Sequence, residues 1–155
     1  MKRIPLTQGR EAFVSDKDYG YLMQWKWYFN GGYAVRNKPG PSRGTPMMHT
    51  VVARRKGVQS REVDHMDRNR LNNQRSNLRA ASRQQNVANS GPRRNGRTGF
   101  RGVTWRGRNQ KFQARITVNG NQESLGLYRA AVEAAQAYNK AASKYFGPYA
   151  YQNRV

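Results

Sequence analysis

The residues best suited to chemistry lie in the segment Glu62-Val63-Asp64-His65-Met66-Asp67 and in the asparagine-rich stretch that follows it. His65 is one of only 2 histidines in the chain. Asn77 follows His65 by 12 residues, and Asn86 follows Asn77 by 9 more. Phosphodiester hydrolysis needs a base for water, a cation to neutralise the phosphate, and a group that holds the base in place. One histidine, the adjacent carboxylate of Asp64 and two asparagines can supply all three.

The charge balance predicts a polyanionic partner. Lys and Arg number 29 against 8 Asp and Glu, so the net charge is +21, and the isoelectric point is near 11.3. No acidic residue stands between Asp67 and Glu123, which leaves a long basic stretch suited to binding phosphate. We therefore expect a nucleic-acid partner rather than an anionic membrane surface.

Composition excludes several other classes. No apolar run approaches the ~18 residues of a membrane span, and residues 1–5 lack an apolar signal core, so we expect a cytoplasmic protein. Cysteine is absent, so neither disulfides nor thiolate zinc sites can hold the fold. The 155 residues suffice for one ordinary domain or two small ones.

The first part of the chain predicts a small β-containing unit. The expected elements are strands at 4–7 and 12–15, a short helix over 17–24 capped by Asp16, and a hairpin of 25–29 with 33–36 around Asn30-Gly31-Gly32. Trp25, Trp27 and Phe29 alternate as one buried face of a strand requires. We interpret these aromatic side chains as core rather than as base-stacking groups.

The segment around His65 predicts a strand, a loop and a helix in that order. The expected elements are a loop over 38–46, a helix or strand over 47–55, a strand over 62–65, a polar loop over 66–76, and a helix from residue 76 or 77 to about 89. The helix is inferred from Leu78, Ala81, Gln85 and Ala88, which recur at helical spacing.

The last third of the chain predicts a compact sheet and helix. The basic segment 90–97 is the best domain boundary, and Asn119-Gly120 is a favoured hairpin turn. The expected elements are strands over 100–105, 111–118 and 122–127, then an alanine-rich helix over 129–146 that Gly147-Pro148 ends.

Three motifs carry a resemblance to a known family. Val63-Asp64-His65, Ser76-Asn77-Leu78-Arg79 and Arg83-Gln84-Gln85-Asn86 resemble the three parts of an HNH endonuclease, the ββα-metal nuclease fold. The pattern is similar to phage homing endonucleases, in which asparagine replaces the final histidine. The segment from Trp25 to Arg36 resembles the N-terminal part of the same enzymes.

The resemblance implies a role for each motif residue. His65 would be the general base, and Asn77 would orient the far nitrogen of its imidazole, fixing the tautomer. Asp64 and Asn86 would hold one divalent cation, Mg²⁺ or Mn²⁺, with waters and phosphate oxygens completing the octahedron. The alternative for His65, a structural histidine at a strand end, is outweighed by the residues around it.

Further residues near the motif have less specific expectations. His49 resembles a histidine common upstream of this motif, and we expect it to pack or to contact phosphate. Asp67 is expected to cap the loop. Several arginines could clamp the DNA backbone, although any of them could be only solvated: Arg68, Arg70, Arg75, Arg79 and Arg83, followed by Arg93, Arg94 and Arg97 in the basic segment.

Residues 98–153 resemble the plant ethylene-response-factor (Apetala-type) DNA-binding domain. The matching runs are Phe100-Arg101-Gly102-Val103-Thr104-Trp105, Lys111-Phe112-Gln113-Ala114-Arg115-Ile116, Leu125-Gly126-Leu127-Tyr128 and the alanine-rich run 134–142. The resemblance implies that the sheet face opposite the helix binds DNA through Arg101, Thr104, Arg106, Arg108, Arg115, Thr117, Gln122 and Ser124. A bulge near Gly102 or Gly107 is needed to align the first three. The alternative is a basic sheet that contacts phosphates only.

Together these patterns predict an α+β protein. An HNH nuclease domain spans 1–90, with an N-terminal β-hairpin extension (1–46) and a ββα-metal core (47–90). A basic linker (91–97) and a DNA-binding domain (98–155), a three-stranded antiparallel sheet packed on one helix, follow.

The predicted function is metal-dependent, site-specific cleavage of double-stranded DNA of the homing type, by a monomer or homodimer with no membrane and no small-molecule substrate. One alternative is a non-catalytic DNA-binding protein with a degenerate nuclease fold. An RNA-binding or ribosome-associated protein would explain the charge but not the Asp-His…Asn…Asn set.

Overall fold

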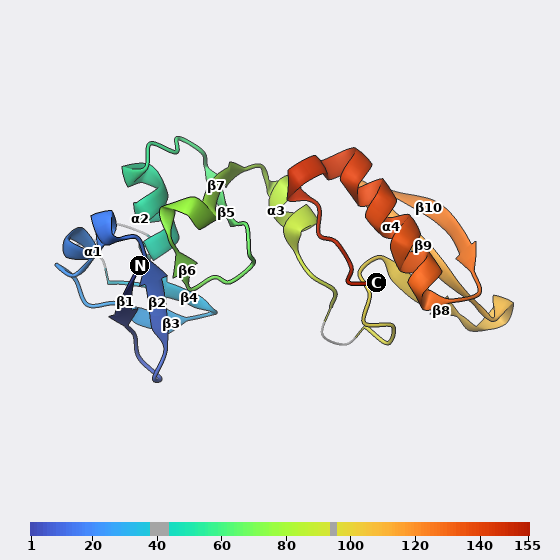
Figure 1. Cartoon of the computed structure of the whole chain (residues 1–155), viewed down its shortest axis with the longest axis horizontal. Coiled ribbons are helices and arrows are strands. Elements are labelled where there is room, and N and C mark those ends of the chain that lie inside the picture. Colours follow the sequence, from blue (N-terminus) through green and yellow to red (C-terminus); the bar gives the residue numbers. More distant parts are fainter. Residues whose placement is uncertain (38–43, 94–95) are drawn as a thin grey trace. The chain divides into compact units, whose positions relative to one another are not determined.

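The computed structural model describes residues 1–37, 44–93 and 96–155. The chain forms two compact units, Met1–Ser82 and Arg83–Val155, and each mixes helices with antiparallel strands (Figure 1). Most of the loop expected at 38–46, and Arg94, lie outside the described residues. Within the described ranges, no helix is both long and apolar enough to cross a membrane.

The first unit begins with two hairpins around a short helix. Its elements are β1 (Lys2–Pro5), β2 (Glu11–Val14), α1 (Asp16–Leu22), β3 (Tyr28–Asn30) and β4 (Tyr33–Val35). Gly31 and Gly32 have φ of 56° and 89°, the two positive values that a tight hairpin turn needs. The order strand, strand, helix, hairpin is as predicted, but the second hairpin begins later, so Trp25 and Trp27 precede β3.

The aromatic residues of this region form core, as expected. Trp27 is only 5% exposed, and its indole N–H donates to the carbonyl oxygen of Leu22 at 2.8 Å. Trp25 and Phe29 are half-buried and pack against the same cluster. A buried indole whose N–H is satisfied is an anchor for the unit rather than a surface for stacking bases.

The middle of the chain differs from the expected order. The elements are α2 (Met48–Arg55), β5 (Glu62–His65), β6 (Asn72–Asn73), the 3₁₀ turn η1 (Arg75–Asn77), β7 (Leu78–Ala81) and α3 (Arg83–Asn89). The predicted helix from residue 76 or 77 is therefore wrong in its first half. Pairing with β5 buries Leu78 and Ala81, and only the residues from Arg83 onward are helical.

A buried carboxylate joins α1, α2 and η1. Asp18 has no exposed surface, and it accepts hydrogen bonds from Arg75 Nε (2.7 Å), Arg75 Nη2 (2.8 Å) and Arg55 Nε (3.1 Å). The hydrogen bond from Arg75 lowers the pKa of the Asp18 carboxyl, although burial acts in the opposite direction. The three charges therefore hold the start of the chain against the turn that precedes β7.

The second unit has the predicted three-stranded antiparallel sheet packed on one helix. After α3 come β8 (Val103–Arg106), the 3₁₀ turn η2 (Gly107–Asn109), β9 (Lys111–Val118), β10 (Asn121–Tyr128), α4 (Ala131–Phe146) and the 3₁₀ turn η3 (Gly147–Tyr149). The strand order is β10-β9-β8, and Asn119 and Gly120 form the turn with φ of 51° and 83°. Ala114 and Ile116 pack toward α4, where small alanines allow close approach.

The expected irregularity of the sheet lies elsewhere. The register shifts in β10 between Ser124 and Gly126, not in β8 near Gly102 or Gly107. Gly102 instead has φ of 75° and ends the pairing of the first strand with β9, where the Arg115 amide donates to its carbonyl oxygen at 2.8 Å. A Cβ built on Gly102 would overlap the Tyr138 ring and lie 2.6 Å from the Arg115 carbonyl oxygen.

Gly102→Ala should therefore destabilise the second unit by about 2–5 kcal/mol, because backbone strain at positive φ adds to steric overlap. Scanning calorimetry of the full chain measures the loss. Gly99→Ala is the matched control: its φ is 69°, but nothing lies within 4 Å of an added Cβ. The control should cost only about 1–2 kcal/mol. Equal losses for both variants would contradict a steric role for Gly102.

Candidate active site

Asp64 and His65 lie at the end of β5, paired with β7. Both side chains are buried, at 6% exposure each. Asp64 stands directly across from Arg79 in the register, and its Oδ2 accepts from Arg79 Nε at 2.9 Å and contacts Nη2 at 2.7 Å. Opposite charges on facing positions of paired strands attract. The pairing thus fixes the orientation of the carboxylate beside the histidine.

Asn73 fixes the tautomer of His65. The Oδ1 atom of Asn73 lies 3.2 Å from His65 Nε2, and Asn73 Nδ2 donates to the Leu71 carbonyl oxygen at 3.2 Å. Because Nδ2 faces a carbonyl, Oδ1 faces the imidazole and accepts a hydrogen bond from it. The proton of neutral His65 therefore sits on Nε2, and the lone pair is on Nδ1.

This contact corrects the expectation for Asn77. The Asn77 amide accepts from the Asp67 backbone N–H at 3.0 Å and donates to Asp67 Oδ1 at 2.8 Å and to the Asn72 carbonyl oxygen at 2.8 Å. The η1 turn directs its side chain into the loop, while β6 directs Asn73 toward His65. No local pattern marks Asn73, since β6 is only 2 residues long and pairs in parallel with β2.

Asp67 caps the loop between β5 and β6, as expected. Its Oδ1 also accepts from the Asn69 backbone N–H at 2.8 Å, and its Oδ2 accepts from Asn72 Nδ2 at 2.7 Å. Arg68 has φ of 65°, a left-handed conformation within this tight loop. A carboxylate with several amide donors orders the residues on either side of it, so the loop holds β6 close to His65.

A second histidine packs on the first. The ring of His49, on α2, is 5.0 Å from that of His65 in an edge-to-face arrangement. Tyr33 of β4 lies 5.3 Å from His49 and 6.4 Å from His65, and the Arg70 guanidinium is 4.6 Å from the Tyr33 ring. This favours the packing role expected for His49. The hairpin β3–β4 and α2 thus form one wall of the site.

Burial keeps both imidazoles neutral. It lowers the pKa of His49 from 6.5 to about 4, because burial disfavours its charged form, and repulsion from His65, when that residue is protonated, and from Arg70 adds to the effect. Burial also lowers the pKa of His65, although the hydrogen bond to Asn73 and the charges of Asp67 and Asp64 oppose it. Neutral His65 at pH 7 is the form that can accept a proton.

The donor chemistry around Asp64 suits a hard cation with a sparse protein shell. Among the described residues, no group of three or more His, Cys, Asp or Glu could hold a metal ion. The carboxylate of Asp64 is a hard oxygen donor of the kind that Mg²⁺ prefers, a cation that keeps several of its waters, and it does not suit structural zinc. Asn86 is half-buried on α3 and belongs to the second unit, so its role as a ligand stays a prediction.

Comparison with known proteins decides the family. The family model of the HNH endonuclease matches residues 47–88. An uncharacterized HNH endonuclease of Acanthamoeba polyphaga mimivirus is 32% identical over 149 residues, which are 96% of this chain and 77% of that protein. The chain belongs to the HNH endonuclease family. No solved structure matches it. Membership implies a phosphodiester hydrolase acting on nucleic acid.

The arginines predicted to clamp DNA fall into two groups in this HNH endonuclease. Arg75 and Arg79 are paired with buried Asp18 and Asp64, and only 29% and 17% of their side chains are exposed. Their charges are already compensated within the protein, and we leave them out of the proposed DNA surface. The exposed members among the described residues are Arg68, Arg70, Arg83, Arg93 and Arg97.

The sheet of the second unit presents a linked polar face opposite α4. Arg106 Nε donates to Gln113 Oε1 at 2.7 Å, and Arg115 Nη1 donates to Gln122 Oε1 at 2.8 Å. Gln113 Nε2 continues to Ser124 Oγ at 3.3 Å. Of the residues predicted for this face, Arg106, Arg115, Gln122 and Ser124 take part in these hydrogen bonds, whereas Arg101 precedes β8 and donates to the Ser90 carbonyl oxygen. Thr117 and Arg108 are exposed, and Thr104 is half-buried.

The low pKa of His49 predicts how stability depends on pH. Unfolded His49 takes up a proton near pH 6.5, whereas the buried side chain does so only near pH 4. Stability should therefore fall as the pH drops from 6.5 to 4, by up to about 3 kcal/mol from this group. His49→Gln should remove this part of the pH dependence of the free energy of unfolding, which urea unfolding at several pH values measures. Met47→Gln, at an exposed neighbouring position, should keep the wild-type slope; a parallel curve for His49→Gln would contradict the assignment.

Proposed function

We propose that this member of the HNH endonuclease family is a metal-dependent, site-specific DNA endonuclease of the homing type, in which His65 is the general base. The supporting observation is a buried, neutral imidazole whose Nε2 is held by Asn73, so that the basic lone pair is on Nδ1. A general base must be unprotonated at working pH and fixed in one tautomer. His65 meets both conditions.

In this proposal, the residues around His65 prepare it for proton transfer. His65 Nδ1 removes a proton from the attacking water, and the imidazolium that forms donates a stronger hydrogen bond to Asn73 Oδ1. The negative charges of Asp67 and Asp64 favour that imidazolium. Asn77 acts as a positioning residue, because it holds the Asp67 carboxylate and its backbone N–H.

Asp64 and Asn86 are proposed to hold one divalent cation, Mg²⁺ or Mn²⁺. When bound, such a cation neutralises charge on the scissile phosphate and the leaving oxygen. Arg79 keeps the Asp64 carboxylate in a fixed orientation and lies across from it on β7. Both proposed ligands offer hard oxygen donors, which is the preference of these cations.

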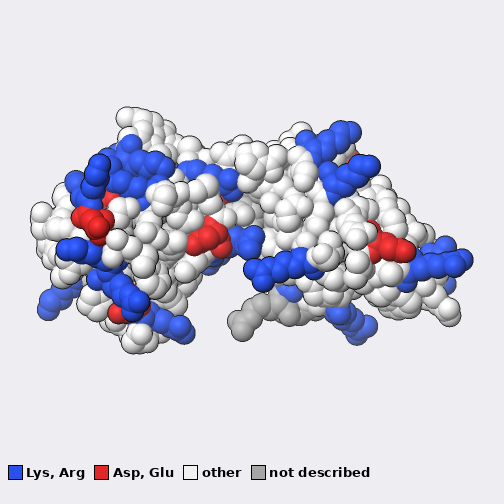
Figure 2. All heavy atoms as spheres, viewed as in Figure 1, with Lys and Arg blue, Asp and Glu red and all other residues white. Residues whose placement is uncertain are grey.

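Double-stranded DNA is the proposed substrate, and the sheet face of the second unit is proposed to select the site. Figure 2 shows Lys and Arg atoms spread over both units, with only small patches of Asp and Glu. Arg106, Arg115 and their glutamine partners offer the donors and acceptors that read base edges in the major groove. The basic surface elsewhere would supply sequence-independent attraction.

A second candidate is a DNA-binding protein without catalysis. One observation favours it: the described residues contain no cluster of three or more metal-ligating side chains. Incubation of the wild-type chain with plasmid DNA and Mg²⁺ separates the two candidates. Metal-dependent nicking or cutting supports the endonuclease, and binding without any cleavage supports the second candidate.

His65→Ala should lower the cleavage rate about 10²–10⁴-fold, because the water loses its base. DNA affinity should be unchanged. Single-turnover cleavage assays and binding assays measure the two effects. Met66→Ala is the neighbouring control, since Met66 is 43% exposed and lies outside the proposed machinery. Cleavage by His65→Ala at the wild-type rate would sink the assigned mechanism.

DNA affinity should fall steeply with salt. If about 6–10 phosphates are neutralised, affinity should drop by ~10³–10⁵ between 50 and 200 mM salt. Arg97→Gln should reduce the slope of log affinity against log salt by about 1, if this exposed arginine contacts a phosphate. Lys144→Gln, an exposed cation on α4, is the control and should leave the slope unchanged. A flat salt response would contradict backbone-dominated binding.

A further inference from the structure

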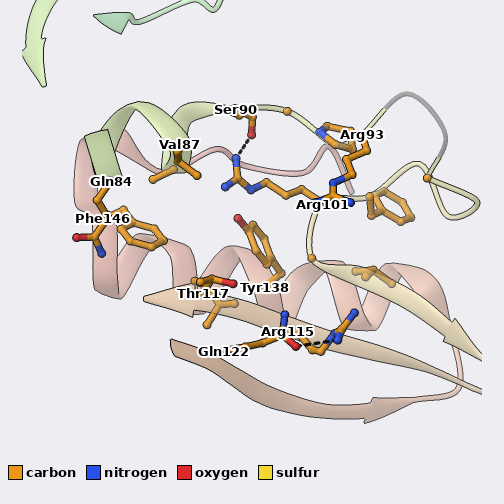
Figure 3. A pocket seen from close by; sticks show the side chains of 18 of the residues that line it. Gln84, Val87, Ser90, Arg93, Arg101, Arg115, Thr117, Gln122, Tyr138 and Phe146 are labelled. Atoms are coloured by element: carbon orange, nitrogen blue, oxygen red, sulfur yellow. Dashed lines mark hydrogen bonds between the residues drawn. The ribbon is translucent and has the colours of Figure 1, made fainter. Parts of the chain in front are cut away.

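The second unit contains a cleft of about 1010 Å³, which extends from the sheet-face residues Arg115, Thr117 and Gln122 to α3 and the residues after it (Figure 3). Its walls come from α3, from the residues just after α3, from the start of β8 and from the end of β9. Val87, Phe100 and Phe146 give it apolar surface. All of its lining residues lie between Arg83 and Phe146, so the cleft belongs to this unit alone.

The charge of the cleft points to an anionic occupant. Four arginines line it, and no Asp or Glu is among its lining residues: Arg83, Arg93, Arg101 and Arg115. Figure 3 shows the Arg101 side chain extending across the cleft toward Ser90, whose carbonyl oxygen accepts from its guanidinium. The guanidinium of Arg101 also lies 6.0 Å from the Tyr138 ring. Arg101 thus places a positive charge within the cleft rather than on the sheet face.

One strand edge opens into the same cleft. Pairing between β8 and β9 ends at Val103 and Ala114, and one further hydrogen bond joins the Arg115 amide to Gly102. Backbone groups of alternate residues point to the same side of a strand, so the N–H and C=O of Thr117 point to the side that β8 leaves open. Thr117 is exposed and lines the cleft. This edge offers hydrogen bonds to a ligand.

A side-chain hydroxyl adds to these polar groups. The Oγ1 atom of Thr104 is buried and has no hydrogen-bond partner among the described residues. Thr104 lines the cleft as well. A buried hydroxyl without a partner is unfavourable, so a ligand group that donated to it or accepted from it would recover part of that cost.

Size and surface together select the occupant. The volume of the cleft lies at the upper end of the ~300–1,000 Å³ of small-ligand pockets, so it can enclose a small ligand or a short segment of a longer one. Apolar walls combined with arginines are the features that bind unpaired nucleotides, through base stacking and phosphate contacts. We propose that this cleft binds a short single-stranded segment of DNA. The proposal rests on the proposed function, and it adds single-stranded DNA as a ligand of the second unit.

Two exposed valines on helices give a matched test. Val87 on α3 is 56% exposed and lines the cleft, whereas Val132 on α4 is 44% exposed and does not. Fluorescence anisotropy with a labelled single-stranded oligothymidylate measures affinity in the full chain carrying His65→Ala, so that no cleavage occurs. Val87→Glu should weaken binding at least ~10-fold, because an apolar contact is lost and the new carboxylate repels the phosphates. Val132→Glu should change it less than ~2-fold.

A second pair of variants guards against misfolding. Arg101→Gln should weaken binding of the same oligonucleotide and reduce the slope of log affinity against log salt by about 1. Arg129→Gln, at an exposed position, should do neither. Equal effects of the two members of either pair would overturn the proposal. So would a loss of duplex affinity in Val87→Glu as large as the loss of single-strand affinity.

Two further measurements distinguish DNA from RNA as the ligand and binding in the cleft from cleavage. An oligouridylate bound more than ~10-fold tighter than the oligothymidylate would overturn the assignment to DNA and indicate single-stranded RNA. Cleavage of DNA is measured separately, with the wild-type chain that retains His65. Failure of the cleft therefore leaves the endonuclease proposal intact, and absence of cleavage leaves the binding result interpretable.

Discussion

The buried carboxylate of Asp18 is the interaction on which the first unit depends. It holds Arg75, whose backbone N–H donates to Ser15 Oγ and whose carbonyl oxygen accepts from Lys56 Nζ. Arg75 begins the turn that leads directly into β7, so the position of that strand beside β5 follows from an ion pair formed 57 residues earlier in the chain. Removing one partner of a buried pair leaves an uncompensated charge, which costs about 3–5 kcal/mol. The N-terminal helix is thus part of the scaffold of the active site.

The same arrangement explains why the imidazole of His65 favours its neutral form. The imidazole is enclosed by His49 and Tyr33, which come from α2 and β4, and this enclosure lowers its pKa. Asn73 reaches it because β6 pairs with β2, the strand immediately before α1. Burial favours the neutral imidazole, and the side-chain amide of Asn73, which the β2–β6 pairing brings close, selects its tautomer. Neither effect comes from the Asp64-His65 sequence alone.

Features with local causes could be predicted from the sequence, and features with long-range causes could not. The Gly31-Gly32 and Asn119-Gly120 turns and the strands of the second unit follow from backbone preference and two-residue alternation. The spacing of Leu78 and Ala81 is compatible with a helix that continues into the later one. These residues form a strand only because they pair with β5. Asn73 was missed for the same reason. Motif resemblance located His65, but the neighbours that set its state come from outside the motif.

The division of charge explains how so basic a chain can be both stable and ready to bind a polyanion. Three of its carboxylates stabilise the first unit: Asp18 with Arg75, Asp64 with Arg79, and Asp67 with loop amides. The arginines of the sheet face and the cleft instead contact neutral groups, such as Gln113, Gln122 and the Ser90 carbonyl. A guanidinium held by an amide or carbonyl oxygen is oriented, but it keeps its full charge. A phosphate can therefore pair with such a guanidinium without displacing a carboxylate. The arginines that stabilise the fold are thus different from those proposed to contact DNA.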